Sequence, residues 1–375
     1  MKLGLRVTGD QMVQLMEAAL ASDFATVKKL GGEIAQLCLE QGDELTAKRL
    51  RAFMRRRGVP LQASGMHQAL PVDGVSRLPL IEEEPWPSTP VILNPSVQNV
   101  VDRFVHDVRS VKLLAEGGLL TRFGLMLSGP PGTGKSLLAG HIAAQLRRPF
   151  LIARLDSLIS SRLGETAKNI RQIFEFGAAR GGILFLDEID AVAKMRDDRH
   201  ELGELKRVVN TVIQGLDSLD DQAVVIAATN HPQLLDTAIW RRFPYRADIG
   251  LPNSDTRAAL WLHFLYAGNA EKQERASLLG QISVGFSGAD IENLALATRR
   301  HAVLNRIDLP ESNLVWAITK SDPPNIQLPE LGEQNTEQKR EMVRRMAALS
   351  QTHKPVIADM LRISRQMVYR YLKEE

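Results

Sequence analysis

A chain of 375 residues, of which 44% are hydrophobic, is long enough to form two or three domains with cores of their own. Its net charge is only +3, and no apolar run approaches the roughly 18 residues that a membrane helix needs. The opening stretch MKLGLRVTGDQM lacks the apolar segment of a secretory signal, so we expect a cytoplasmic protein with no membrane segment. The single cysteine, Cys38, excludes an internal disulfide and a cysteine metal cluster.

The first part of the chain has the spacing of short amphipathic helices. Apolar residues recur every three or four positions in MVQLMEAAL, FATVKKLGGEIAQLCLE and LTAKRLRAFM, which predicts a helical bundle over residues 1–58. Seven prolines and the acidic run IEEEPWP then indicate a linker over residues 59–95.

Short apolar runs alternate with helical patterns in the middle of the chain. The runs GLMLSG, PFLIARL, GILFLDE, AVVIAATN and RADIGLP are typical of strands buried on both faces. We therefore expect an α/β fold over residues 96–252, in which helices cover both faces of a parallel sheet. Helical spacing returns over 253–320, a second linker is expected over 321–336, and a helical C-terminal domain over 337–375.

The stretch GPPGTGKS lies between the strand GLMLS and the helix LLAGHIAAQL, which is the setting of a phosphate-binding loop. Its glycines let backbone N–H groups turn toward the phosphates of ATP, and the helix presents its positive end to them. Lys135 is expected to contact the β and γ phosphates, and Ser136 to hold Mg²⁺. The residues expected to bind nucleotide here are Gly129, Pro130, Pro131, Gly132, Thr133, Gly134, Lys135, Ser136 and Leu137.

Polar residues follow two more of the predicted strands. Asp187 ends GILFLD and can bind the magnesium shell, while Glu188 can orient and deprotonate the attacking water. Asn230 ends AVVIAATN at the same height, where its amide can sense the γ phosphate or hold the water. The tandem Arg241 and Arg242 can reach the nucleotide site of a neighbouring subunit as arginine fingers, which requires an assembly; surface arginines that are merely solvated are the alternative.

Six ordered motifs carry a family resemblance over residues 96–320: GPPGTGKS, LISSRLGETAKNIRQIFEFGAA, ILFLDEIDAVAK, VVNTVIQGLDSL, AATNHPQLLDTAIWRRF and GFSGADIENLALAT. Together they resemble the AAA ATPases in the narrow sense, which include katanin, spastin and the proteasomal ATPases. The resemblance implies an ATPase with a helical lid, a ring that is usually a hexamer, and mechanical remodelling of a macromolecule. It also implies that Gly288 and Ala289, in GFSGAD, approach the nucleotide closely.

One position departs from that family. The loop before GE normally offers an aromatic residue to the central pore, where it grips a polypeptide. Here the loop reads SSRLGET, so Arg162 takes the aromatic position and Leu163 follows it. An arginine could hold an acidic peptide or a phosphate backbone, with Leu163 as an apolar wedge, or the loop threads nothing.

The C-terminal stretch carries nine Lys/Arg against five Asp/Glu over residues 337–375 and divides into three helical segments. The last two, HKPVIADML and SRQMVYRYLKE, resemble the helix-turn-helix of the resolvase and invertase recombinases, with Ala358 as the small residue at the crossing. Arg365, Gln366, Tyr369 and Arg370 would then contact DNA. Arg362 stands where that turn commonly has glycine, and a docking module with solvated arginines is the alternative.

These features lead to a hexameric ATPase that remodels a protein substrate or adaptor while its tail tethers it to DNA. The chain also loosely resembles stand-alone bacterial ATPases that are paired with a subtilisin-like protease encoded nearby. The alternative is a DNA-acting ATPase that regulates transcription, replication or a mobile element, with DNA as the direct substrate. A binding module in which ATP is only a structural ligand is disfavoured, because Glu188 and the paired arginines are present.

Overall fold

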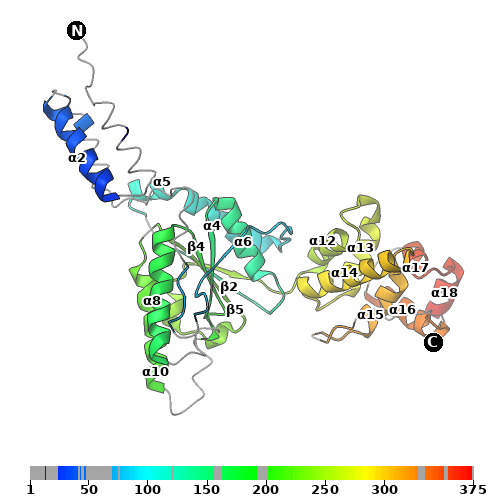
Figure 1. The fold of residues 1–375 in the computed structure, drawn as a ribbon. Helices are drawn as coiled ribbons and strands as arrows, with labels where there is room; N and C mark the ends of the chain where they lie inside the picture. The colour runs from blue at the N-terminus through cyan, green and yellow to red at the C-terminus, as the bar shows by residue number, and fades with distance from the viewer. Residues whose placement is uncertain are drawn as a thin grey trace, which may run out of the picture. The chain divides into compact units, whose positions relative to one another are not determined.

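The computed structural model describes residues 13, 24–40, 43, 46–47, 70–74, 77–119, 122–155, 163–191, 202–220, 222–323, 325–327, 334–349 and 354–373. The chain forms two compact units, residues 1–71 with 179–181 and residues 72–178 with 182–375. In the first unit, α2 (Phe24–Glu40) buries Leu30, Ala35 and Cys38 (Figure 1). Most of the N-terminal bundle predicted from the sequence lies outside the described residues. Over the ranges given above, no helix combines the length and the apolar character that crossing a membrane requires.

The second unit contains a six-stranded sheet with the order β1-β3-β4-β5-β2-β6 (Figure 1). The five strands predicted from the apolar runs are present and mutually parallel: β2 (Phe123–Ser128), β3 (Phe150–Arg154), β4 (Ile183–Asp187), β5 (Val224–Thr229) and β6 (Tyr245–Asp248). The sequence did not indicate β1 (Glu82–Glu84), which lies inside the predicted linker. It pairs antiparallel with β3. The sheet is therefore mixed and not wholly parallel. All three β1 residues are exposed acids, and the strand occupies the edge of the sheet by pairing with β3.

Helices cover both faces of this sheet because successive strand residues point to opposite sides. On one face, Leu125 and Leu127 of β2 pack with α4 (Pro95–Arg109) and α6 (Lys135–Leu146) in one buried cluster. On the other, Leu184 of β4 contacts α8 (Leu163–Arg180), which packs in turn against α10 (Leu202–Ser218). The remaining short elements are α5 (Val111–Glu116), η2 (Pro232–Leu234) and α11 (Thr237–Trp240).

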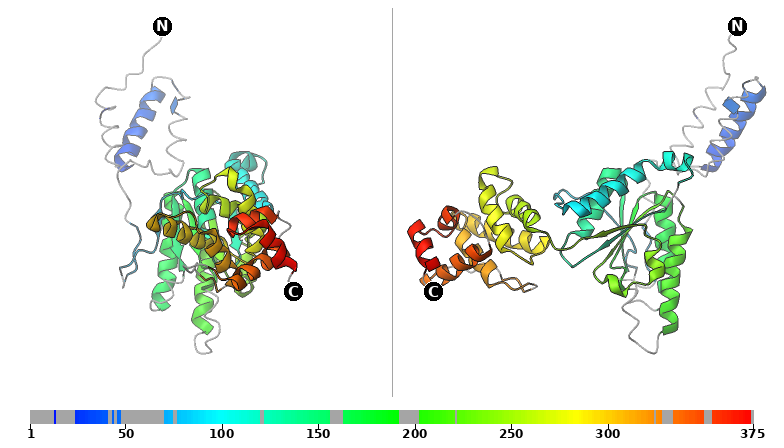
Figure 2. Two further views of the ribbon diagram at one scale, coloured as in Figure 1. Left: turned by 90° about the vertical axis from the view of Figure 1, so that its right-hand side faces the viewer. Right: turned by 180° about the vertical axis from the view of Figure 1, so that it is seen from behind.

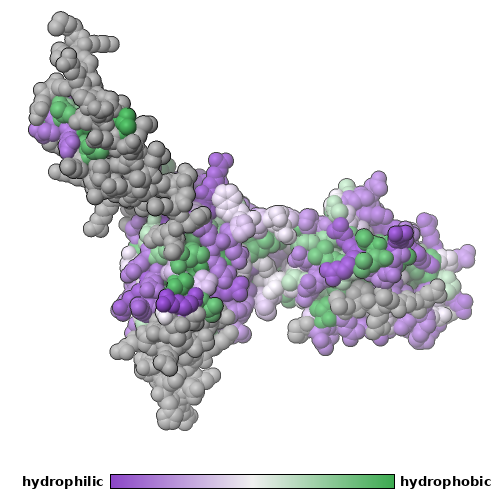
Figure 3. Space-filling view, viewed as in Figure 1, coloured by the Kyte–Doolittle hydropathy of each residue, from purple (hydrophilic) through white to green (hydrophobic). Residues whose placement is uncertain are grey.

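The helices after the sheet form one helical body. Its elements are α12 (Ser254–Phe264), η3 (Ala270–Lys272), α13 (Gln273–Ile282), α14 (Gly288–Asn305), α15 (Glu311–Lys320), α16 (Thr336–Leu349), α17 (Lys354–Met360) and α18 (Arg365–Lys373). We call α12–α15 the lid and α16–α18 the tail. The views in Figure 2 place the tail against the lid, and Figure 3 shows apolar surface patches on both.

The lid and the tail share a single hydrophobic core. Met346 of α16 and Val368 of α18 are fully buried in the same cluster as Trp261 and Leu279 of the lid. Arg345 of α16 donates a hydrogen bond to the carbonyl oxygen of Thr319, at the end of α15. The tail expected over residues 337–375 therefore has no core of its own among the described residues, although the sequence between it and the lid has the composition of a linker.

Candidate functional site: a phosphate-binding loop at the sheet edge

The loop between β2 and α6 is shaped by glycines whose conformations other residues rarely adopt. Gly129 has φ +146°, and a Cβ atom there would collide with the carbonyl oxygen of Ile249. Gly134 caps α6 in the left-handed region, with φ +89°. These two turns bring the loop around the N-terminal end of α6, where free backbone N–H groups favour a bound anion. The loop predicted from GPPGTGKS thus has the backbone that phosphate binding needs.

Lys135 and Ser136 begin α6 and lie at the base of this loop. The Lys135 ammonium is buried and donates hydrogen bonds to the carbonyl oxygens of Gly129 at 3.0 Å and Pro130 at 2.8 Å. Burial lowers the pKa of Lys135, whereas the carboxylates of Asp187, Asp190 and Glu188 act in the opposite direction. A cation held at the centre of the loop is suited to a polyphosphate.

The end of β4 brings two carboxylates to this loop. The Ser136 hydroxyl donates to Oδ2 of Asp187 at 3.3 Å, and Oδ1 of Asp187 accepts the backbone N–H of Glu188 at 3.0 Å. A hydroxyl and a carboxylate are ligands of the kind that Mg²⁺ accepts beside phosphate and water oxygens, so the donor set fits that ion. Glu188 itself has φ +50°, an uncommon conformation for a residue with a Cβ. Such strain is concentrated at functional sites.

The end of β5 is held by a residue that the sequence analysis did not single out. Asp190 is fully buried, and its Oδ1 accepts the Thr229 hydroxyl at 2.9 Å and the Asn230 backbone N–H at 3.2 Å. The side-chain Oδ1 of Asn230 is buried and has no hydrogen-bond partner among the described residues. A buried amide with an unused acceptor can orient a water molecule or a ligand. The second aspartate of LDEID was the sequence signal for this anchor.

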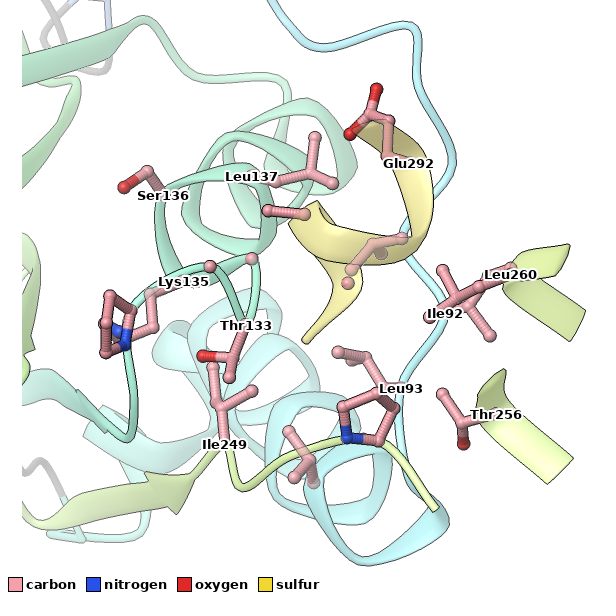
Figure 4. Close-up of a pocket in the computed structure, with 18 of the residues that line it drawn as sticks. Ile92, Leu93, Thr133, Lys135, Ser136, Leu137, Ile249, Thr256, Leu260 and Glu292 are labelled. Carbon is pink, nitrogen blue, oxygen red and sulfur yellow. The ribbon is translucent and has the colours of Figure 1, made fainter. Parts of the chain in front are cut away.

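A cavity of about 460 Å³ joins these groups. Its lining includes Lys135, Ser136, Asp187, Glu188 and Asn230, together with the segment 89–94 that precedes α4. Figure 4 shows Ile92 and Leu93 of this segment near Leu260 and Thr256 of α12, with the phosphate-binding loop on the other side. The pocket therefore has a charged end and an apolar end, as a nucleotide requires.

The lid reaches the pocket through the start of α14. The backbone N–H of Ala289 donates to the carbonyl oxygen of Gly132 at 3.0 Å, and Gly288 also lines the cavity. A Cβ atom on Gly132 would lie 2.7 Å from the Ser287 hydroxyl, so only glycine permits this approach. The start of α14 thus contacts the phosphate-binding loop, and the expected approach of Gly288 and Ala289 to the nucleotide stays a prediction.

The tandem arginines after α11 differ from each other. Arg242 donates to both carboxylate oxygens of Asp217, at 3.0 and 3.3 Å, and to the carbonyl oxygen of Ala238. Hydrogen bonds from Arg242 and then from Arg122 lower the pKa of Asp217. Arg241 is exposed, and no hydrogen bond of its side chain is seen within the described ranges. Arg242 is therefore oriented from within its own chain, whereas Arg241 is available to another molecule.

The structure describes the predicted DNA-contacting side chains but not those of the predicted pore loop. Arg162 lies outside the described residues, and Leu163 is the first residue of α8, its side chain undescribed. Arg365, Gln366, Tyr369 and Arg370 are all exposed on α18, and the Lys354 ammonium lies 4.3 Å from the centre of the Tyr369 ring. Arg362 adopts the left-handed conformation, with φ +50°, at the turn where the recombinases have glycine.

Comparison with known proteins identifies the sheet domain. Residues 125–251 match the "ATPase family associated with various cellular activities (AAA)". An "Uncharacterized AAA family ATPase y4kL" of Sinorhizobium fredii is 44% identical over 153 residues, which are 41% of this chain and 46% of the relative. A putative 26S proteasome regulatory subunit homolog of Methanocaldococcus jannaschii is 34% identical over 52% of this chain and 54% of its own. A proteasome-activating nucleotidase of Sulfurisphaera tokodaii is 31% identical over 62% of each chain.

The fold is also that of a solved structure, the FIGL-1 AAA domain. It is 22% identical, with a TM-score of 0.50, and the match covers 78% of this chain and 90% of that one. The chain spans about half the length of the curated relatives it matches. Residues 125–251 therefore match the AAA family of ATPases, and the chain is similar to proteasome-activating nucleotidases.

Proposed function

We propose that this protein, which contains an AAA-family ATPase domain, hydrolyses ATP with the aid of Mg²⁺ and works as a ring, with a hexamer as the expected form. The observation that carries the proposal is the convergence of Lys135, Ser136, Asp187, Glu188 and Asn230, from the ends of three neighbouring strands, on one cavity. The proposal includes a second subunit because the exposed Arg241 side chain makes no hydrogen bond to the described residues of its own chain.

The roles follow from the chemistry of each side chain. The Lys135 ammonium binds the β and γ phosphates in exchange for the loop carbonyls that it now contacts. Ser136 and Asp187 would hold Mg²⁺, which supplies charge neutralisation on the phosphates when bound. Glu188 takes a proton from the attacking water, and Asn230 orients that water. Arg241 of a neighbouring copy would stabilise the charge of the transferred phosphoryl group.

Replacing Glu188 with Gln tests hydrolysis directly. The amide keeps the size of the side chain but cannot accept the proton, so turnover should fall by about 10²- to 10⁴-fold while ATP still binds. Turnover is measured as phosphate release, and binding with a fluorescent ATP analogue. The matched control is Glu116→Gln at the exposed end of α5, which should hydrolyse ATP like the parent. Unchanged turnover in Glu188→Gln would favour ATP as a structural ligand.

We further propose that the ATPase remodels a protein. The support is the relation of its ATPase domain to proteasome-activating nucleotidases, whose name states an action on the proteasome. Arg162→Ala should then leave basal hydrolysis intact and remove work on a protein substrate. The work is measured as ATP-dependent unfolding of a tagged fluorescent protein. Unfolding at the parental rate by this variant would exclude a gripping role for the loop. A nearby subtilisin-like protease as partner stays a prediction from resemblance alone.

DNA is the second proposed partner, and one observation favours it: α18 exposes two arginines, a glutamine and a tyrosine on one helix. Arginines can pair with phosphates, and an aromatic ring beside a lysine can pack on a sugar or a base. DNA as a tether and DNA as the direct substrate are distinguished by whether duplex DNA raises the hydrolysis rate.

The test is the double change Arg365→Glu and Arg370→Glu, measured by fluorescence anisotropy with labelled duplex at two salt concentrations. The matched control is Arg103→Glu with Arg300→Glu, which makes the same change in charge at exposed positions on α4 and α14. Loss of binding in the first variant only is expected. Equal binding by both would identify the tail as a protein docking module.

A further inference from the structure

A short segment closes the apolar end of the nucleotide pocket. Residues 89–94, which we call the strap, run from the end of the predicted linker to the start of α4 and line the cavity throughout. The side chains of Ile92 and Leu93 lie near Leu260 and Thr256 of the lid helix α12 (Figure 4). The strap has no helix or strand of its own, so its position depends on what holds its two ends.

One end is attached to the phosphate-binding helix. The carbonyl oxygen of Thr89 lies 2.7 Å from Nε2 of His141, which is on α6. Just before it, the indole N–H of Trp86 donates to the carbonyl oxygen of Arg148 at 3.0 Å. This end therefore follows the sheet domain.

The other end is attached to the connection between the sheet and the lid by one side chain. Oδ1 of Asn94 accepts the Thr256 hydroxyl at 2.9 Å and the Asn253 backbone N–H at 3.2 Å, while Nδ2 donates to the carbonyl oxygen of Leu251 at 3.4 Å. Asn253 is also the residue that caps α12, since its side chain accepts the N–H of Thr256 at 2.8 Å. Asn94 thus contacts the first turn of the lid and the segment leading to it.

We infer that Asn94 is a positioning residue for the base of the nucleotide: it holds the strap against the start of α12 and so keeps the apolar end of the pocket in its binding shape. The inference rests on the proposed ATPase function. Without the three contacts of Asn94, the strap samples other positions, and apparent affinity falls with the fraction of molecules in the competent one. The affinity for nucleotides, which occupy the base end, should fall, whereas the affinity for a ligand that uses only the phosphate end should not.

The test compares Asn94→Leu, which has a similar volume and no hydrogen bonds, with Asn94→Asp, which can keep the two accepted contacts. Each full-length variant is titrated with a fluorescent ATP analogue and, in competition, with ATP and with inorganic tripolyphosphate; KM and kcat are measured beside them. For Asn94→Leu we expect the Kd and KM for ATP to rise by about tenfold, because all three hydrogen bonds of the Asn94 side chain are lost, with kcat at saturation kept. Asn94→Asp should show a smaller rise.

Tripolyphosphate separates positioning from general damage, because its affinity should be unchanged in both variants. The matched control is Gln98→Leu, which removes a hydrogen bond to Asp102 on the exposed side of α4 and should bind ATP like the parent. An unchanged Kd for ATP in Asn94→Leu, or equal weakening of ATP and tripolyphosphate, would overturn the inference. If Asn94→Leu does not fold, the same comparison of ATP with tripolyphosphate is made with Asn94→Asp, and the same outcomes support or overturn the inference. Absence of hydrolysis in the parent would count against the proposed function and leave the affinity test of the strap intact.

Discussion

The sheet domain and the helical body of lid and tail differ in what their charged groups contact. In the sheet domain, the buried side chains of Asp190 and Lys135 are held by hydrogen bonds close to the edge where the strands end. In the helical body, the interior is a continuous apolar cluster, and its main ionic network, formed by Arg275, Glu311 and Asp359, lies where the lid meets the tail. The polar groups of the sheet domain lie at the candidate site, whereas those of the helical body connect the lid to the tail.

The largest effect should come from removing the tail. A chain ending at residue 335 lacks Met342, Val343, Met346 and Val368, all fully buried with lid residues. The exposed lid core should then lose its cooperative folding, so that hydrogen exchange in α13 and α15 becomes fast. Native protection of these helices in the truncated chain would show that the lid is independent. A truncation therefore tests folding, and the arginine changes on α18 test DNA binding.

A change in the phosphate-binding loop should damage only the sheet domain. Gly129→Ala places a Cβ against the Ile249 carbonyl at a φ that is essentially restricted to glycine, so ATP binding should be lost and stability reduced by about 1–3 kcal/mol. Gly134→Ala is the matched control, since a Cβ there meets nothing within 4 Å and only the left-handed φ is unfavourable. In thermal unfolding without nucleotide, Gly129→Ala should have a lower Tm than Gly134→Ala. The reverse order would contradict the close approach at Ile249.

The ionic network should contribute less than the shared core. Arg275→Met leaves the carboxylate of Glu311 buried with Tyr266 as its remaining side-chain partner among those described, at 2.7 Å. Breaking a buried pair on one side costs about 3 kcal/mol, and we expect that loss in urea unfolding. Arg300→Met, on the exposed side of α14, should change stability by less than about 0.5 kcal/mol. Equal stability of the two variants would show that the network contributes nothing.

The smallest effect is expected at the arginine pair. Asp217 is about two-fifths exposed, so the loss of its contacts in Asp217→Asn should cost no more than about 1 kcal/mol. Because Arg242 and Arg122 lower the pKa of this carboxyl, its contribution is present above the unfolded value of about 3.9 and is lost as the pH falls further. Urea unfolding at pH 7 should show a lower free energy of unfolding for Asp217→Asn than for the parent, and at pH 3 this difference should shrink. A difference that grows toward low pH would contradict the assignment.

The sequence predicted the strands of the sheet, and the residues that meet at its edge, better than it predicted the connections between parts. GPPGTGKS and GILFLDE are readable because adjacent residues carry both the strand and the site, and the five parallel strands were predicted with them. Asp190 was missed because its partners, Thr229 and Asn230, are about forty residues away. The edge strand β1 was missed because EEE has no apolar pattern and depends on β3 for its hydrogen bonds.

The union of lid and tail was missed for a similar reason. Composition indicates a linker over residues 321–336, and a linker in sequence does not show whether the segments that it joins share a core. The buried residues of α16 and α18 belong to one cluster with those of the lid helices, which lie far back in the chain. The pore loop remains a prediction, since Arg162 lies outside the described residues.

The shared core of lid and tail carries a thermodynamic consequence. The lid touches the phosphate-binding loop at Gly132 and the strap at Asn94, and the tail is built into the lid. Suppose that a partner on α18 binds more tightly when nucleotide fixes the lid. By linkage, that partner must tighten nucleotide binding by the same factor. The affinity for ATP and the affinity of the tail for its partner are then two readings of a single coupling free energy, and measuring either one with and without the other ligand gives its value.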